Sequence, residues 1–188
     1  MPAGPLRHAP RLRVVILDRD GVINHDSPAY IKTPDEWQPI AGSLEAIARL
    51  CHAGLRVVVA SNQAGVGRGL IELPILMAIH AKMNAAVERA GGRLDAIFFC
   101  PHHPDDGCGC RKPAPGLLLE ALRRLDASPD EAVAIGDSTR DVQAAAAAGV
   151  PARLVRTGNG ERDAADAGPH VPVHADLAAA AAALLAPA

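Results

Sequence analysis

Short runs of consecutive apolar residues alternate along this chain with longer segments of helical periodicity. The apolar runs are Val14–Leu17, Leu55–Ala60, Ala96–Phe99, Ala132–Ile135 and Ala152–Val155. Strands that are buried on both faces appear as unbroken apolar runs, and their alternation with helices is typical of βαβ units. The pattern predicts an α/β fold, a Rossmann-like three-layer sandwich around a mainly parallel sheet.

The segments between these runs predict the helices. They are Ser43–Ala53, Glu72–Ala90, Pro115–Leu125, Asp141–Ala148 and an alanine-rich helix from about Ala175, with a short edge strand at Val171–Val173 before it. Glycine follows several of them, as is usual where a helix ends. A chain of 188 residues fits one domain. We expect residues 12–188 to form it, and residues 1–11, which hold three prolines, to be a flexible tail.

Composition excludes several kinds of partner. The formal net charge is −2 and aromatic residues make up only 2%, which argues against a nucleic acid. No uncharged apolar stretch is long enough to cross a bilayer, and the first apolar run is too short for a signal peptide. We therefore expect a cytoplasmic protein with no membrane partner. Nothing in the sequence requires a second subunit, so a monomer is expected.

Polar residues follow three of the predicted strands. These are Asp18-Arg19-Asp20, then Ser61-Asn62-Gln63, then Gly136-Asp137-Ser138 with Asp141 close behind. Ligands of open parallel sheets bind beyond the carboxyl ends of the strands, so these side chains should meet. Clustered carboxylates suit Mg²⁺, which commonly recruits phosphate as a further ligand. Lys112 could add positive charge there, and Ser61 with the N–H groups after it could hold phosphate oxygens.

Other phosphate and metal motifs fit less well. A calcium loop is disfavoured because Gly21 directly follows the second Asp and no Glu closes a twelve-residue loop. No P-loop motif occurs, and the glycines of 65–69 match a dinucleotide fingerprint only with the third glycine one residue early. A phospho-aspartate receiver module remains an alternative, although the position after the third strand, where its phosphorylated Asp normally stands, holds Cys100.

Residues 100–110 combine three cysteines with two histidines, in the order Cys-Pro-His-His-Pro-Asp-Asp-Gly-Cys-Gly-Cys. Three thiolates and one imidazole within eleven residues predict a closed, structural Zn²⁺ site. From the residues alone, the imidazole could be that of His102 or His103. The fourth cysteine, Cys51, lies on a predicted helix face and is expected in the core. Because Arg111 and Lys112 follow directly, a zinc ion in this loop would hold both cations near the phosphate pocket.

Four motifs in order resemble those of the haloacid-dehalogenase-like phosphatases, over residues 13 to 157. They are Leu17-Asp18-Arg19-Asp20-Gly21-Val22-Ile23, Ser61-Asn62-Gln63, Arg111-Lys112-Pro113, and Gly136-Asp137-Ser138 with Asp141. Within that superfamily the chain resembles the histidinol-phosphatase-like group. The resemblance implies that Asp18 is the nucleophile and Asp20 the general acid and base. It places Mg²⁺ between Asp18, the backbone carbonyl of Asp20, and Asp137.

The same resemblance implies further roles. Ser61, Asn62 and Lys112 would hold the phosphoryl oxygens, and Asp141 would orient Lys112 or a metal-bound water. The zinc ligands would be Cys100, His102, Cys108 and Cys110, because the group carries a C-x-H…C-x-C loop at this place. We expect the remaining phosphate or substrate contacts from Arg19, Asp26, Gln63, Arg68, Arg111 and Ser138.

The substrate expectation rests on residues 62–69, which resemble the loop of the branch that acts on heptose bisphosphate. That branch removes the C7 phosphate of heptose 1,7-bisphosphate. The alternative is histidinol phosphate, whose branch tends to carry Asp where Ala64 stands. Arg68 and Arg111 favour a substrate with a second phosphate, although Arg68 could also be a solvated loop charge. Ser138 stands where some relatives in the heptose branch have Lys.

No separate cap domain is expected over the site. Residues 24–42 are too few for one, and residues 64–110 are already occupied by a helix, a strand and the zinc loop. Three loops should therefore cover the site: Asp26–Tyr30, Gly65–Gly69 and the zinc loop. Such a site suits a small phosphorylated sugar.

Overall fold

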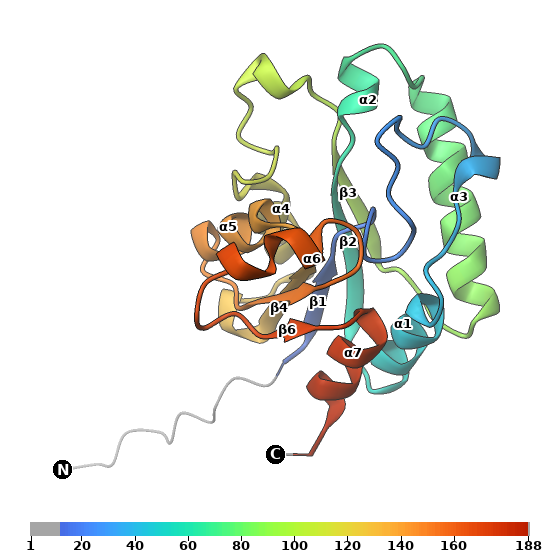
Figure 1. Ribbon diagram of the computed structural model, residues 1–188. Coiled ribbons are helices and arrows are strands. Elements are labelled where there is room, and N and C mark those ends of the chain that lie inside the picture. The colour runs from blue at the N-terminus through green and yellow to red at the C-terminus, as the bar shows by residue number, and fades with distance from the viewer. Residues whose placement is uncertain (1–11, 188) are drawn as a thin grey trace.

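A computed structural model describes residues 12–187 of the chain, so the predicted tail at 1–11 lies outside the described residues. Its centre is a six-stranded sheet of order β3-β2-β1-β4-β5-β6, in which every neighbouring pair is parallel (Figure 1). The strands are β1 (Val14–Leu17), β2 (Arg56–Asn62), β3 (Ala96–Cys100), β4 (Ala132–Gly136), β5 (Ala152–Val155) and β6 (Val173–His174). The predicted parallel α/β fold is confirmed.

Two layers of helices cover the sheet, because successive side chains of each strand point to opposite faces. Val15 and Leu17 of β1 pack in one apolar cluster, and Val14 and Ile16 pack in the other. The first cluster includes side chains of α1 (Ser43–His52), α3 (Leu73–Arg89) and α7 (Leu177–Leu185). The second includes α4 (Gly116–Leu125) and α5 (Thr139–Ala147), on the other side of the sheet (Figure 1). Both faces of β1 are thus buried, as its unbroken apolar run predicts.

Several boundaries differ from the sequence expectation. Strand β2 runs on to Asn62, so Ser61 and Asn62 belong to the strand and do not follow it. The glycine-rich turn expected next is instead the short helix α2 (Ala64–Gly67), whose Gly65 carbonyl accepts the N–H groups of residues 70 and 71. Helix α5 begins two residues early because Ser138 and Asp141 form a capping box at its start. The edge strand lies at β6, two residues later than expected, and the short helix α6 (Gly160–Asp163) has no counterpart in the prediction.

The segment between β1 and α1 folds against the sheet and contains one 3₁₀ turn, η1 (Pro34–Glu36). Trp37, the single tryptophan, follows this turn and is fully buried in the core. Within residues 12–187, neither this segment nor residues 64–110 contains a separate cap domain, as expected. The other 3₁₀ turns are η2 (Pro104–Asp106), η3 (Pro129–Glu131) and η4 (Ala164–Asp166). No helix of the described residues is long and apolar enough to cross a membrane.

Candidate active site

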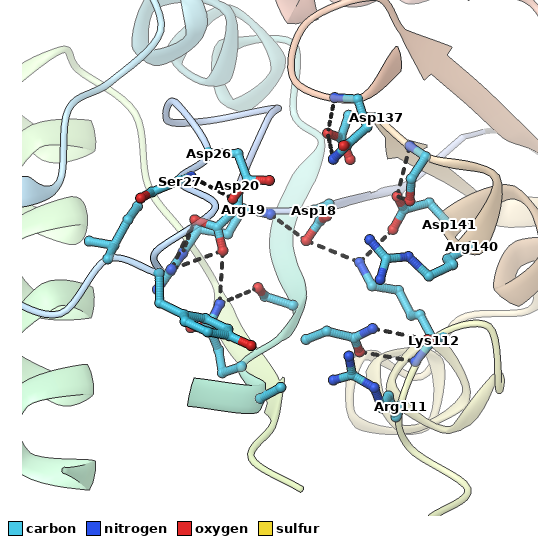
Figure 2. A pocket seen from close by; sticks show the side chains of 18 of the residues that line it. Asp18, Arg19, Asp20, Asp26, Ser27, Arg111, Lys112, Asp137, Arg140 and Asp141 are labelled. Atoms are coloured by element: carbon cyan, nitrogen blue, oxygen red, sulfur yellow. Dashed lines mark hydrogen bonds and ion pairs between the residues drawn. The ribbon is translucent and has the colours of Figure 1, made fainter. Parts of the chain in front are cut away.

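A polar cavity of about 470 Å³ opens at the carboxyl ends of β1, β2 and β4 (Figure 2). This is where ligands of an open parallel sheet bind. Five acidic and five basic side chains line it: Asp18, Asp20, Asp26, Asp137, Asp141, Arg19, Arg68, Arg111, Lys112 and Arg140. The polar residues that follow the first, second and fourth predicted strands therefore meet in one place.

The buried ammonium of Lys112 joins two of the carboxylates. Its Nζ lies 3.0 Å from Asp18 Oδ1 and 2.5 Å from Asp141 Oδ1, and it donates to the Ala60 carbonyl at 2.7 Å. Burial by itself lowers the pKa of Lys112, but the charges of Asp141 and Asp18 outweigh that effect and raise it. Lys112 is therefore a permanent positive charge beside Asp18.

For Asp18, burial outweighs the effect of the neighbouring lysine on its pKa. Burial, opposed by the charge of Lys112 and reinforced by the neighbouring carboxylates, raises the pKa of Asp18 to about 8. Burial likewise raises the pKa of Asp137 to about 6, although Asn159 donates to its Oδ2 from both the backbone and the side chain. Burial and the neighbouring carboxylates thus both favour the protonated forms of Asp18 and Asp137. A divalent cation bound between them would add positive charge and lower both pKa values.

The geometry fits such a cation. Ligand oxygens of Asp18, Asp137 and Asp141 all lie within 4.8 Å of one another. Two glycines make room for the Asp137 carboxylate: a Cβ on Gly21 or on Gly158 would lie 2.1 Å from its Oδ2. Asp141 is engaged by Lys112 and by the hydroxyl of Ser138, which donates at 2.6 Å, so its side chain faces the lysine. Asp18 and Asp137 are thus the carboxylates available to a hard cation.

Asp20 is held by donors on both of its oxygens. Arg19 donates to Oδ1 through Nε at 3.0 Å and to both oxygens through Nη2 at 2.9 Å. Asn24 donates to Oδ1 at 2.9 Å, and Gln63 donates to Oδ2 at 3.0 Å. The sequence expectation was that Arg19 and Gln63 contact phosphate or substrate. Both line the cavity, but the structure shows their side chains orienting Asp20.

The expected phosphate-binding residues at the end of β2 also lie at the cavity. Ser61 Oγ is buried and accepts from Gln63 Nε2 at 2.8 Å. Asn62 binds the backbone of Lys112 twice, donating to its carbonyl at 2.9 Å and accepting from its N–H at 3.0 Å. Asn62 therefore fixes the Arg111–Lys112 segment to the sheet, which adds a structural task to its expected one. Ser138 lines the cavity while its hydroxyl caps α5.

The outer part of the cavity carries the expected covering loops. Asp26, Tyr30, Arg68 and Pro104 line it, one or two from each of the three loops. Arg111 lines it as well, and its Nη1 is buried with no hydrogen-bond partner among residues 12–187. In Figure 2 the side chains of Arg111 and Arg140 both extend into the pocket. Arg111 and Arg140 are therefore not paired with the inner carboxylates.

Sequence reasoning missed several contributors. Arg140 stands in the first turn of α5, next to Asp141, and its position after the fourth strand was a usable signal. No sequence signal pointed to Asn24, which donates to Asp20. Its own Oδ1 accepts from the indole Nε1 of Trp37 at 3.0 Å. Asn159 and the buried His80 of α3 likewise come from segments without a motif. Asn24, Asn159 and His80 reach the site only through tertiary contacts.

The cysteine cluster assembles beside the cavity. The Sγ of Cys110 lies 3.2 Å from the Sγ of Cys100 and from Nδ1 of His102. One ligand atom from each of four residues lies within 4.8 Å of the others: Cys100, His102, Cys108 and Cys110. Tetrahedral ligands about 2.3 Å from a zinc ion are similarly close together, so the set fits that metal. His103 points elsewhere, because it caps η2 by accepting the N–H of Asp105.

Known proteins match this chain closely. A family described as HAD-hydrolase-like matches residues 109–180. The D-glycero-β-D-manno-heptose-1,7-bisphosphate 7-phosphatases of Bordetella bronchiseptica and Pseudomonas putida are 54% and 50% identical, over 84% and 80% of this chain and 88% and 86% of theirs. A crystal structure of D,D-heptose 1,7-bisphosphate phosphatase from B. bronchiseptica, complexed with magnesium and phosphate, covers 93% of this chain and 98% of its own at 53% identity, with a TM-score of 0.89. The chain belongs to the haloacid-dehalogenase-like phosphatase family.

Proposed function

We propose that this phosphatase removes the C7 phosphate of D-glycero-D-manno-heptose 1,7-bisphosphate through a phosphorylated Asp18. The observation that carries the proposal is the inner arrangement of the cavity: a carboxylate at a strand end, 3.0 Å from a buried lysine, beside a second carboxyl group held by three donors. The names of the relatives at 50% and 54% identity support the choice of substrate.

In the first step, an oxygen of Asp18 attacks phosphorus, and the bond from phosphorus to the sugar O7 breaks. Asp20 gives its proton to O7 as the alcohol leaves. In the second step, Asp20 removes a proton from water, which attacks the phosphorus of the aspartyl-phosphate. The bond from phosphorus to the Asp18 oxygen breaks, inorganic phosphate leaves, and the Asp18 carboxylate is regenerated. Lys112 balances the negative charge that accumulates between Asp18 and the phosphoryl group.

Mg²⁺ would be held by Asp18, Asp137 and the backbone carbonyl of Asp20. It supplies the positive charge that lets one anion approach another. Asp141 would hold Lys112 in place from the other side, as its 2.5 Å contact suggests. The similar B. bronchiseptica phosphatase was crystallised as a complex with magnesium and phosphate, which supports this assignment.

The outer cations favour a bisphosphate over histidinol phosphate. Within the cavity, Arg19 is paired with Asp20 and Lys112 with Asp18 and Asp141. Arg68, Arg111 and Arg140 remain, with Asp26 as the acidic residue at the same end. A second phosphate would satisfy the buried Nη1 of Arg111, whereas the ammonium of histidinol would meet like charge.

We propose that Zn²⁺ binds to Cys100, His102, Cys108 and Cys110 and has a structural role. The loop packs directly on α2, where a Cβ on Gly67 would lie 2.4 Å from the His103 nitrogen. It leads into Arg111 and Lys112, so fixing it fixes both cations. The four cysteines form no disulfide, and unpaired thiols persist in reducing compartments, which supports a cytoplasmic location.

Phosphate release in the presence of Mg²⁺ tests the function. Purified protein should hydrolyse heptose 1,7-bisphosphate, leave the C1 phosphate in place, and prefer this substrate to histidinol phosphate and to heptose 7-phosphate. A preference for histidinol phosphate would replace the proposed substrate. Hydrolysis of none of the three would contradict the proposal, and assaying both sugar anomers would identify the preferred one.

A further inference from the structure

Arg19 is almost completely buried, with 1% of its side chain exposed. A buried guanidinium needs acceptors for its N–H groups, since an unpaired charged donor is strongly destabilising. Nε and Nη2 of Arg19 make three hydrogen bonds to the Asp20 carboxylate. The remaining nitrogen, Nη1, lies 3.5 Å from Nε2 of His80. The two partners of the guanidinium are therefore the proposed general acid and one histidine.

His80 lies in α3, 61 residues from Arg19, and 5% of it is exposed. The ring of Phe99, at the end of β3, packs against the imidazole edge-to-face with centroids 5.6 Å apart. Burial and the charge of Arg19 lower the pKa of His80 to about 4. The imidazole is therefore neutral near pH 7, and a neutral ring can accept a hydrogen bond at Nε2.

We propose that His80 is a positioning residue for Asp20, which it orients through Arg19. Hydrogen bonds to Asp20 alone would let the guanidinium rotate together with the carboxyl group, whereas a further contact with His80 of α3 fixes the plane of the guanidinium. His80 thus connects α3 to Asp20 through Arg19. This inference rests on the role of Asp20 in the proposed function.

The readout is the dependence of the rate on the leaving group. Protonation by Asp20 matters for a sugar alkoxide and hardly at all for p-nitrophenolate, which leaves as a stable anion. The ratio kcat/KM contains only the steps up to alcohol release, so it isolates this proton transfer from the later attack of water. Both esters are measured, heptose 1,7-bisphosphate and p-nitrophenyl phosphate.

For His80→Leu we expect a loss of about 10-fold or more in kcat/KM for heptose 1,7-bisphosphate, since a positioned general acid contributes about 10²–10⁴-fold. The loss for p-nitrophenyl phosphate should stay below about 3-fold, because no proton is needed there. His80→Gln should restore most of the sugar-phosphate activity, because its Oε1 can accept from Arg19. Asn84→Leu is the matched control: it lies one turn further along α3, and its Oδ1 has no partner among residues 12–187. Its ratio between the two esters should equal that of the wild type.

Equal losses on both esters, no loss on the sugar phosphate, or a glutamine variant as impaired as the leucine variant would overturn the inference. If His80→Leu does not fold, His80→Asn replaces it, since its shorter side chain keeps a polar group but cannot bring an acceptor to Nη1 of Arg19, and it should show the same selective loss. Asp20→Asn separates the two proposals. A uniform loss in that variant would refute the acid role of Asp20 itself, and a wild type inactive on both esters would refute the proposed function.

Discussion

Replacing Asp141 by Asn should weaken both the fold and the catalyst. The Asp141 carboxylate is 7% exposed, and its Oδ1 lies 2.5 Å from Lys112 Nζ. Its Oδ2 accepts from the hydroxyl of Ser138 at 2.6 Å and from the Ser138 N–H at 3.1 Å. Asparagine has nearly the same shape and can still accept from Ser138. It offers no charge to Lys112, so the substitution isolates the ion pair.

The structure allows the magnitude to be worked out. Removing one partner of a buried ion pair costs about 3–5 kcal/mol, because the other charge is left uncompensated. Lys112 retains two partners, Asp18 at 3.0 Å and the Ala60 carbonyl at 2.7 Å, which reduces the loss. We expect the free energy of unfolding to fall by about 2–3 kcal/mol. For a chain of this length that corresponds to a Tm lower by roughly 4–12 °C.

Catalysis should fall with it. Lys112 then relies on Asp18 alone for an anionic partner, so its ammonium is less firmly held where the phosphoryl group arrives. We expect kcat to drop by roughly 10- to 100-fold. Complete removal of one preorganised hydrogen-bond donor lowers kcat by about 10²–10³-fold, and here the donor is only loosened. Urea denaturation and steady-state phosphate release measure the two effects. Asp166→Asn, the same charge change at an exposed site, is the control.

The reasoning would be refuted if the Asp141→Asn variant lost less than about 0.5 kcal/mol, the range of an ordinary surface substitution. If stability fell strongly but kcat did not change, the ion pair would be important for folding only, and the proposed positioning of Lys112 for catalysis would be refuted.

Four further outcomes are expected. Asp18→Asn should bind heptose bisphosphate without turnover, measured by calorimetry and phosphate release, because the amide is not a nucleophile. Cys108→Ala should lose zinc, measured by elemental analysis, together with most of the activity; full activity without zinc would contradict the structural role. In metal-free protein the raised pKa values of Asp18, about 8, and Asp137, about 6, make the folded state bind more protons than the unfolded chain from about pH 4 to pH 8. Denaturation curves should therefore show stability falling as pH rises through that range, and Mg²⁺ should stabilise more at pH 8 than at pH 5. Gly158→Ala should weaken Mg²⁺ activation at least several-fold, since its Cβ would lie 2.1 Å from Asp137 Oδ2 and its φ is +60°.

The sheet could be predicted almost completely from the sequence. Strands such as Val14–Leu17 are buried on both faces, so each one appears in the sequence as an unbroken apolar run. The placement of Asp18, Ser61 and Asp137 at one edge also followed, because the carboxyl ends of parallel strands meet there. Local errors arose where side chains decide a boundary, as at Ser138, whose hydroxyl starts α5 early.

The cluster of cysteines and a histidine shows where local information ends. Spacing alone leaves His102 and His103 equivalent; the family resemblance implies His102, and the fold gives the physical reason. The structure turns the His102 imidazole toward three sulfur atoms while His103 caps a 3₁₀ turn. Adjacent residues on an extended segment point in different directions, and which of them faces the cysteines depends on the path of the whole loop.

By itself, then, the sequence determined the parallel α/β fold, the order of the four motifs and the carboxylates at the strand ends. Those features are encoded in short-range periodicity and in residues next to each strand. Only the tertiary structure brought His80 to Arg19 across 61 positions and Trp37 to Asn24. Such contacts depend on how helices pack over the sheet, and no local pattern along the chain records that packing.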